Sequence, residues 1–422
     1  MSFTPAVRRD LTLVAAGRAT SMLGDEVAVI ALALWASHQG RGTLAVAALV
    51  MAATLPQLLA APFAGLLVDR LPARRLIATV SSLQALVCLA VVPAIGADDL
   101  GAVLALVVAL NVGQTIANPA WQALVPAIVA PEQISRALGT VQAATAGALL
   151  LGPAVGGLLV GAVGTASALV VDAMSFAVLA VVALALRGDR RPAGTGERTQ
   201  GEMSAGIRLI GRDPVLRSVL VLVTALVLAA GAVNVAEIFL ITGTLGAGPA
   251  VYGLVGALFA GGVMLGAVLA GKDRSVTSAG RTLVGVTISM ACSMVVLGLA
   301  PTLAVAALAS MAVGVGNGML NVLAQSIFVR RSPSDVLGRV FAALQGVIGA
   351  AMLVATGLGG MLLGALGVRP VIVGGGVLAV VALLGVSRPL LTARDTQPAT
   401  SSTGAADTDA QLALAAEGGD AA

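Results

Sequence analysis

The sequence is poor in charged and aromatic side chains. Of its 422 residues, only 10% are charged and 2% are aromatic, whereas 58% are hydrophobic and the mean hydropathy is +1.01. A soluble domain carries about 25% charged residues, so a water-soluble globular enzyme is excluded. The pI of about 10.0 suggests nucleic-acid binding. However, the basic residues lie in short clusters between apolar runs, and few aromatic rings are available for base stacking, so we expect no nucleic-acid partner.

Residues that build metal or nucleophilic sites are also scarce. The chain has two cysteines, Cys88 and Cys292, each inside a long apolar run, and a single histidine, His38. There is no CxxC or Cys/His spacing, so the sequence predicts no metal site, no disulfide framework and no Cys–His nucleophile. With no Gly-rich phosphate loop either, we expect neither an enzyme nor a bound cofactor.

What the sequence has is long apolar runs. A membrane-spanning helix needs about 20 apolar residues, and we predict an all-α membrane protein with twelve such helices. The first follows Arg8, Arg9 and Asp10 and is too long for the apolar core of a cleavable signal peptide. The predicted spans are 11–36, 44–68, 76–95, 101–125, 137–163, 166–186, 219–245, 251–270, 283–300, 303–329, 340–366 and 371–386.

The distribution of basic residues predicts the orientation. With the N-terminus in the cytoplasm, 21 of the 24 basic residues fall in cytoplasmic segments, two (Arg41 and Arg369) fall outside, and Arg18 lies inside the first span. Cytoplasmic loops of membrane proteins are enriched in Lys and Arg. We therefore expect both termini in the cytoplasm and a multi-pass location in the bacterial inner membrane.

The longest hydrophilic connection divides the chain into two sets of six spans. We predict a cytoplasmic N-terminus (1–10), an N-terminal six-helix bundle (11–186), a cytoplasmic linker (187–218), a C-terminal six-helix bundle (219–391) and a disordered cytoplasmic tail (392–422). A docked regulatory tail remains the alternative for the last segment.

The two halves repeat each other at one offset. Matched pairs 203 residues apart include Gln114 with Asn317, Asn118 with Asn321, and, among the glycines, 113 with 316, 156 with 359, 157 with 360 and 164 with 367. The equivalent spans have the same orientation, so the repeat is parallel. Such duplicated halves place a substrate site between them near the bilayer midplane.

A charged motif after the second span resembles the signature loop of the major facilitator superfamily. It runs from Gly65 through Asp69 and Arg70 to Arg74 and Arg75, with Pro72 where the family usually has Gly. The resemblance covers about residues 11–391 and implies two rocking six-helix bundles. It also implies that Gly65, Asp69, Arg70, Arg74 and Arg75 form a cytoplasmic latch. The alternative is that these charges only anchor the topology.

The fifth span is similar to the antiporter motif of exporters in that superfamily. The matching residues are Gly139, Gly152, Pro153, Gly156 and Gly157, with Ala148 in place of one Gly. Proline bends a helix and glycines allow close helix packing, so a kinked packing helix is the alternative. Together with Ser21–Asp25 and Asn118–Gln122, this motif resembles the branch of drug:proton antiporters that includes macrolide-efflux and enterobactin-exporter proteins.

Several ionisable residues lie within the predicted spans. Each costs about 2.5–3.5 kcal/mol near a helix centre, so such groups persist where they face water, pair or bind a proton. Desolvation disfavours the anion of a buried carboxyl, so a carboxyl can take up a proton on one side and release it on the other. We predict proton or substrate sites at Asp25, Glu26, Arg18, Glu237 and Asn234; structural pairing remains the alternative, as it does for Asp172.

These patterns and resemblances predict a bacterial exporter of a hydrophobic or amphipathic small molecule, such as a drug, antibiotic or secondary metabolite. Inward proton flow would drive it by alternating access. A multidrug efflux role in antibiotic resistance follows from the resemblance. We expect a monomer whose partners are the substrate, protons and lipid. The rivals are a dedicated siderophore or metabolite exporter, an uptake symporter, and a non-transporting membrane enzyme or sensor.

Overall fold

The protein is helical wherever its structure is described. The computed structural model describes residues 4–38, 43–129, 133–186, 208–271, 276–332 and 337–392, and every regular element in these ranges is a helix. Ten helical segments of this part of the chain are long and apolar enough to cross a membrane, and Thr43–Gln57 is a shorter apolar segment. The prediction of an all-α chain with many apolar helices is confirmed.

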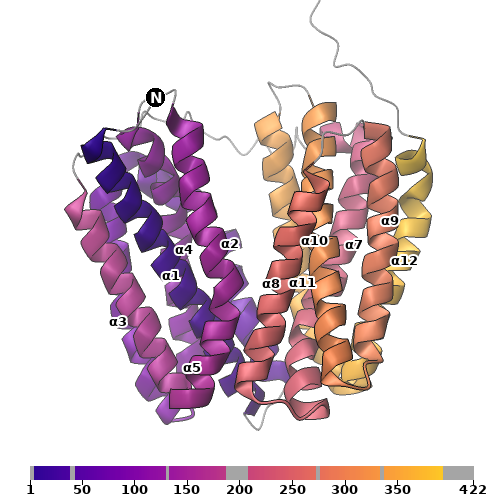
Figure 1. The fold of residues 1–422 in the computed structure, drawn as a ribbon, viewed down its shortest axis with the longest axis horizontal. Helices are drawn as coiled ribbons and strands as arrows, with labels where there is room; N and C mark the ends of the chain where they lie inside the picture. The colour runs from indigo at the N-terminus through magenta and orange to yellow at the C-terminus, as the bar shows by residue number, and fades with distance from the viewer. Residues whose placement is uncertain are drawn as a thin grey trace, which may run out of the picture.

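The helices form two bundles that lie side by side (Figure 1). The bundles approach each other at one end and separate at the end that carries the N-terminus, which we call the closed end and the open end. The first bundle contains α1 (Pro5–His38), α2 (Thr43–Arg70), α3 (Ala73–Gly96), α4 (Leu100–Ile128) and α5 (Ile134–Ala185). The second contains α7 (Pro214–Ile238), η2 (Phe239–Thr244), α8 (Pro249–Ala270), α9 (Val276–Gly298), α10 (Leu303–Arg331), α11 (Leu337–Leu366) and α12 (Val368–Leu391).

Helix α5 is two arms joined at Gly164. The backbone there has φ 83° and ψ 170°, a conformation that only glycine adopts readily. Gly152 and Asp172, at similar distances from Gly164 on opposite arms, both contact the same turn of α1, so the chain reverses direction at this glycine. The two arms correspond to the predicted spans 137–163 and 166–186.

The second bundle turns in the same way at Gly367, between α11 and α12. This residue has φ 84° and ψ 172° and is the sequence-repeat partner of Gly164. Two glycines that the repeat pairs at 203 residues therefore share one unusual backbone conformation. The internal repeat extends from the sequence to the local geometry.

Helix packing repeats as well. A Cβ added to Gly156 would lie 3.0 Å from Val27 Cα on α1, and one added to its partner Gly359 would lie 2.7 Å from Ala232 Cα on α7. Glycine at these positions lets the helix backbones touch. The contact between α5 and α1 is thus matched by the contact between α11 and α7.

The three largest groups of buried apolar side chains explain the separation of the bundles. The largest, which we call the shared core, takes residues from both bundles, for example Ala28 and Leu34 with Val233 and Ile238. The other two belong to single bundles: one is built around residues 11–14, 73–80, 117–137 and 179–186, and the other around 210–229, 270–294, 313–344 and 379–390. The bundles therefore share apolar packing at the closed end and pack independently at the open end.

The helix bounds differ from the predicted spans chiefly at the ends. The last predicted span, 371–386, lies within the longer α12, and the predicted span 219–245 is divided into α7 and the π-helix η2. Asp213 begins α7, because its side chain accepts hydrogen bonds from the backbone N–H groups of Val215 and Leu216. Of the predicted linker, residues 187–207 lie outside the described residues, as do residues 393–422 of the predicted tail.

Candidate functional site

The candidate site is a layer of polar side chains on α1 and α4 where the shared core ends. On α1, Val14 belongs to the core of the first bundle and Ala28 to the shared core, so Arg18 and Asp25 lie between the two. On α4, Leu110 belongs to the shared core and Trp121 to the first bundle's core. The polar layer therefore lies inside the first bundle, at the level along α1 and α4 where the shared core ends.

Two hydrogen bonds connect the charged groups of α1 to the amides of α4. Gln114 Nε2 donates to Asp25 Oδ2 at 2.5 Å, and Arg18 Nη1 donates to Asn118 Oδ1 at 3.1 Å. The Arg18 guanidinium carbon also lies 6.0 Å from the centre of the buried Trp121 ring, at the outer limit of a cation–π contact. The alternative for Asp25, a structural pairing with Arg18, does not appear among the described contacts, because each of the two side chains has an amide partner on α4.

The second bundle lacks this arrangement. The repeat partners of Gln114 and Asn118 are Asn317 and Asn321, and Asn321 Nδ2 donates to Asn317 Oδ1 at 3.0 Å. The matched glycine contacts pair Val27 of α1 with Ala232 of α7, an offset of 205 residues. At this offset the counterparts of Asp25 and Arg18 are the apolar residues Ala230 and Val223. The α1–α4 polar layer is thus a specialisation of the first bundle.

Glu26 lies on a different side of α1 from Asp25 and packs on the predicted antiporter motif. A Cβ added to Gly152 would lie 2.8 Å from Glu26 Cγ. Gly152 is therefore the residue that leaves room for the Glu26 side chain. Two features predicted separately, an intramembrane carboxyl and a glycine motif, are in direct contact.

The same motif also reaches across to the second bundle. A Cβ added to Gly157 would lie 2.8 Å from Gly253 Cα on α8, and one added to Gly256 would lie 2.9 Å from Pro153 Cβ. The segment 152–157 is consequently packed between the α1 carboxyl and α8. A motion of α8 against α5 would act on the helix that holds Glu26 in place.

Glu237 is at the closed end rather than in the polar layer. Its neighbours Ala236 and Ile238 belong to the shared core, and Ser310 Oγ of α10 donates to Glu237 Oε1 at 2.6 Å. Tyr252 of α8 lies within electrostatic range of this carboxyl. Asn234, predicted to share its face, is exposed. The π-helix η2 begins two residues after Glu237, and π-helical turns are frequent at functional sites.

The predicted latch residues are only partly described. Gly65, Asp69 and Arg70 are in the last turns of α2, and their side chains lie outside the described residues. Arg74 Nε donates to the backbone carbonyl of Ala183 at 3.1 Å, and its Nη2 donates to that of Leu184. Arg74 therefore binds backbone carbonyls at the C-terminus of α5, which is a favourable place for a cation. Arg75 is exposed.

Asp172 belongs to a polar cluster that sequence reasoning left as a structural pairing. It is 2% exposed and accepts hydrogen bonds from Ser175 and from the Cys88 thiol of α3. Neither partner was predicted. The spacing of Asp172 and Ser175 on one helix could have suggested the first contact, whereas the contact with Cys88 depends on how α3 and α5 face each other.

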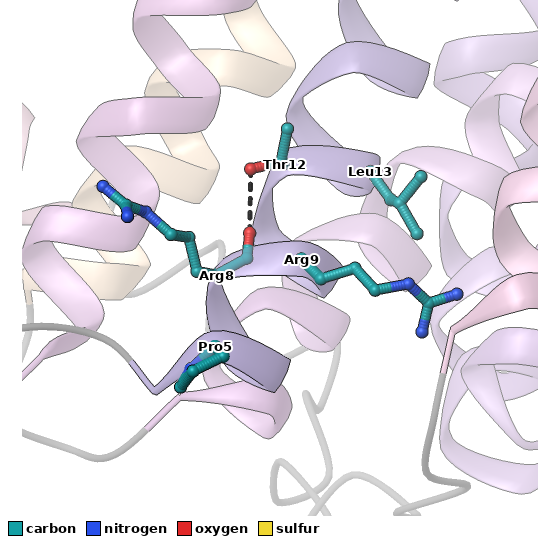
Figure 2. A pocket seen from close by; sticks show the side chains of 5 residues that line it. All are labelled: Pro5, Arg8, Arg9, Thr12 and Leu13. Carbon is teal, nitrogen blue, oxygen red and sulfur yellow. Dashed lines mark hydrogen bonds between the residues drawn. The ribbon is translucent and has the colours of Figure 1, made fainter.

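A shallow recess of about 470 Å³ lies at the open end of α1, away from the polar layer. Figure 2 shows its lining residues, Pro5, Arg8, Arg9, Thr12 and Leu13, with the two arginine side chains directed to opposite sides of the helix. The Thr12 hydroxyl donates to the Arg8 carbonyl at 2.8 Å. Within the described ranges, no group of three His, Cys, Asp or Glu residues is placed to hold a metal ion.

Residues 2–420 match the family model of the transmembrane secretion effectors, a family of major facilitator transporters. The chain belongs to this family. It is 25% identical over 367 residues to an uncharacterised MFS-type transporter, YfiS, of Bacillus subtilis strain 168, which covers 84% of this chain and 87% of the relative. The protein is a multi-pass membrane transporter of small molecules rather than an enzyme.

Solved structures of transporters share the fold. A bacterial homologue of the human lysosomal transporter Spinster, inward-facing and unoccupied, superposes with a TM-score of 0.72 at 13% identity and covers 94% of this chain and 100% of its own. A bacterial homologue of the iron transporter ferroportin, also inward-facing, gives 0.73 at 16% identity and covers 90% and 99%. The nucleoside transporter NupG gives 0.71 at 11% identity, covering 91% and 100%. At such identities the likeness shows the fold alone.

Proposed function

We propose that this transporter exports a hydrophobic or amphipathic small molecule in exchange for protons by alternating access. The chain would cross the inner membrane twelve times as two bundles, 11–186 and 219–391, with both termini and the linker 187–218 in the cytoplasm. In that orientation the open end faces the cytoplasm. The structure then corresponds to the inward-open state, in which substrate enters between the bundles.

The observation that carries the proposal is the polar layer of α1 and α4, at the level where the shared core ends. Asp25 and Arg18 are held by Gln114 and Asn118 of the same bundle rather than by each other. Amide partners do not neutralise a carboxylate, so Asp25 remains able to bind a proton or a cationic group of a substrate. On α1, Asp25 lies between the shared core and the core of the first bundle. At that level it would be within reach of molecules that enter from the open end.

Glu237 supplies the counterpart on the other side of the cycle. In this state it is enclosed in the shared core and held by Ser310. Opening of the closed end would separate α8 from α5 and give Glu237 access to the external side. A carboxyl near each end of the pathway allows protons to enter from outside and leave to the cytoplasm while substrate moves outward.

The antiporter-type motif favours export over uptake. Gly152, Pro153, Gly156 and Gly157 pack between α1 and α8, where they seal the closed end. A dedicated exporter of a siderophore or other metabolite fits the same arrangement, and the two differ only in substrate range. A panel of toxic compounds tested in an efflux-deficient host separates them: protection against several unrelated compounds supports the drug exporter.

Everted membrane vesicles test the mechanism. A preformed acid-inside pH gradient should be dissipated when a transported compound is added, because each exchange moves protons out of the vesicle. We expect Asp25→Asn to abolish this response. Movement of the compound and protons in the same direction would instead identify a symporter. The carboxyls would be removed from the mechanism if the response were equal in the wild type, Asp25→Asn, Glu26→Gln and the double variant.

A further inference from the structure

Asp172 is a titratable group that the mechanism above does not use. It lies on the second arm of α5 and is 2% exposed. Ser175 Oγ donates to Asp172 Oδ1 at 3.2 Å, and Cys88 Sγ of α3 donates to Asp172 Oδ2 at 3.4 Å. A hydroxyl and a thiol are neutral donors, and the thiol is a weak one. The single thiol proton is shared with the Leu169 carbonyl, which lies 3.3 Å from Cys88 Sγ. These contacts supply no compensating charge.

No cation stands against this carboxyl in the part of the chain that the structure describes. The ion pairs found there are Arg9 with Asp10 and Arg331 with Asp213, both distant in sequence and fold from Asp172. The titratable groups around it are Cys88 on α3 and Asp25 on α1, and Asp25 in turn interacts with Glu26 and Arg18. A buried anion without a cation is costly, so this environment suits a neutral carboxylic acid.

The backbone of α1 lies directly on the Asp172 carboxyl. A Cβ added to Gly24 would lie 2.6 Å from Asp172 Oδ1 and 2.8 Å from Ser175 Cβ. The next residue is Asp25, which accepts a hydrogen bond from Gln114 on the opposite side of α1. Any shift of this turn of α1 therefore changes the surroundings of both carboxyls together.

We propose that Asp172 is a further proton-carrying residue of the transport cycle, beyond Asp25 and Glu237, coupled to Asp25 through the Gly24–Asp25 turn of α1. While α1 packs on it, the carboxylate binds one proton to give a neutral carboxylic acid. When α1 moves away and water enters, the O–H bond breaks and the proton leaves to water. This inference rests on the proposed proton exchange and adds a site between α1, α3 and α5.

The test uses the full chain with Asp172→Asn, which preserves the shape and one accepting oxygen but cannot carry the proton. In proteoliposomes with ethidium as probe, we expect ethidium exchange across the membrane to stay within about twofold of wild type, whereas accumulation driven by a pH gradient falls about tenfold or more. Asp99→Asn, at the exposed N-cap of α4, is the matched control and should leave both unchanged. Unchanged pH-driven accumulation in Asp172→Asn would overturn the proposal.

A spectroscopic measurement separates this inference from the proposed function. Infrared spectra of the wild type should contain the C=O stretching band of a buried protonated carboxyl, and Asp172→Asn should remove it. If Asp172→Asn does not fold, Ser175→Ala serves instead, because loss of the hydroxyl donor should shift the band. A band unaffected by either variant contradicts the proposal. Absence of any pH-driven ethidium movement in the wild type, with the Asp172 band present, contradicts the proposed proton exchange alone.

Discussion

Gly152 of α5 lies directly against the side chain of Glu26 on α1. The position that a Cβ would occupy at Gly152 is 2.8 Å from Glu26 Cγ and 3.9 Å from Glu26 Cα, so the absence of a side chain on one helix is what accommodates the carboxyl on the other. In the second bundle the small residue is on the opposite helix: Gly231 of α7 accommodates Ala355 of α11. The two bundles satisfy the same packing requirement with different residues.

Gly152→Ala should therefore destabilise the first bundle. The new methyl group overlaps Glu26, and overpacking of this kind costs about 1–3 kcal/mol. Gly147→Ala on the same arm is the matched control, because a Cβ there meets nothing within 4 Å and removes only glycine's flexibility. Thermal unfolding in detergent should give a lower Tm for Gly152→Ala and an equal or higher Tm for Gly147→Ala. Equal effects of the two substitutions would contradict the contact.

The amides of α4 and their repeat partners on α10 should differ in importance. Gln114→Ala removes the hydrogen-bond donor to Asp25, whereas Asn317→Ala removes only an acceptor for Asn321. We expect Gln114→Ala to lower pH-driven transport about tenfold, because a polar group left unsatisfied costs about 1–3 kcal/mol. Asn317→Ala should stay within about twofold. The measurement is the initial rate of probe transport in vesicles, normalised to the amount of protein. A larger loss of rate for Asn317→Ala than for Gln114→Ala would contradict a proton or substrate site in the first bundle.

A larger residue at Gly253 should prevent closure of the closed end. A Cβ there would lie 2.8 Å from Gly157 Cα and 3.0 Å from Gly157 N, which are backbone atoms that cannot move aside without separating α5 from α8. Gly253→Val should therefore shift the population toward a state that is closed at the other end. Gly248→Ala, which meets nothing within 4 Å, is the control.

Spin labels at the open end measure that shift. Leu138 on α5 and Val329 on α10 are exposed and belong to different bundles, so cysteines at these positions report the separation of the bundles. Cys292 is exposed and is replaced by Ala, whereas Cys88 is buried and stays. The distance between the labels should shorten in Gly253→Val and remain as in the wild type in Gly248→Ala. An unchanged distance in Gly253→Val would show that the contact does not control the opening.

Asp213 should contribute to stability in two separable ways. It caps α7 and also accepts a hydrogen bond from Arg331 Nε of α10 at 2.9 Å. Asp213→Asn keeps a capping oxygen but loses the negative charge, so we expect a loss of less than about 1 kcal/mol. Asp213→Ala loses both and should cost about 1–2 kcal/mol. Denaturation of the two variants measures the difference, and equal losses would show that the cap contributes nothing.

The positions of most helices and the internal repeat could be predicted from the sequence because both depend on patterns along the chain. Apolar runs define the membrane helices, and the glycines at 164 and 367 have the same backbone conformation because both turns need a residue without a side chain. The contact of Gly152 with Glu26 joins two features that were each predicted.

The pairing of side chains between helices could not be predicted, because it depends on which faces meet. Asp25 and Glu26 were each predicted as proton or substrate sites, but the sequence could not show that Asp25 contacts α4 and Glu26 contacts α5. The contact of Cys88 with Asp172 was missed for the same reason. For Glu237 an interhelix hydrogen bond was left as an alternative, but the sequence could not name its donor, Ser310 on α10.

The turns at Gly164 and Gly367 have a practical consequence for experiments on this protein. Each joins two long helices through one glycine, and the other described connections at that end are short, such as residues 97–99 and 245–248. Among the connections that the structure describes there, an antibody fragment or a protease would find almost no loop to recognise. Reagents meant to trap one conformation should be raised against the opposite surface, where the helix ends stand apart.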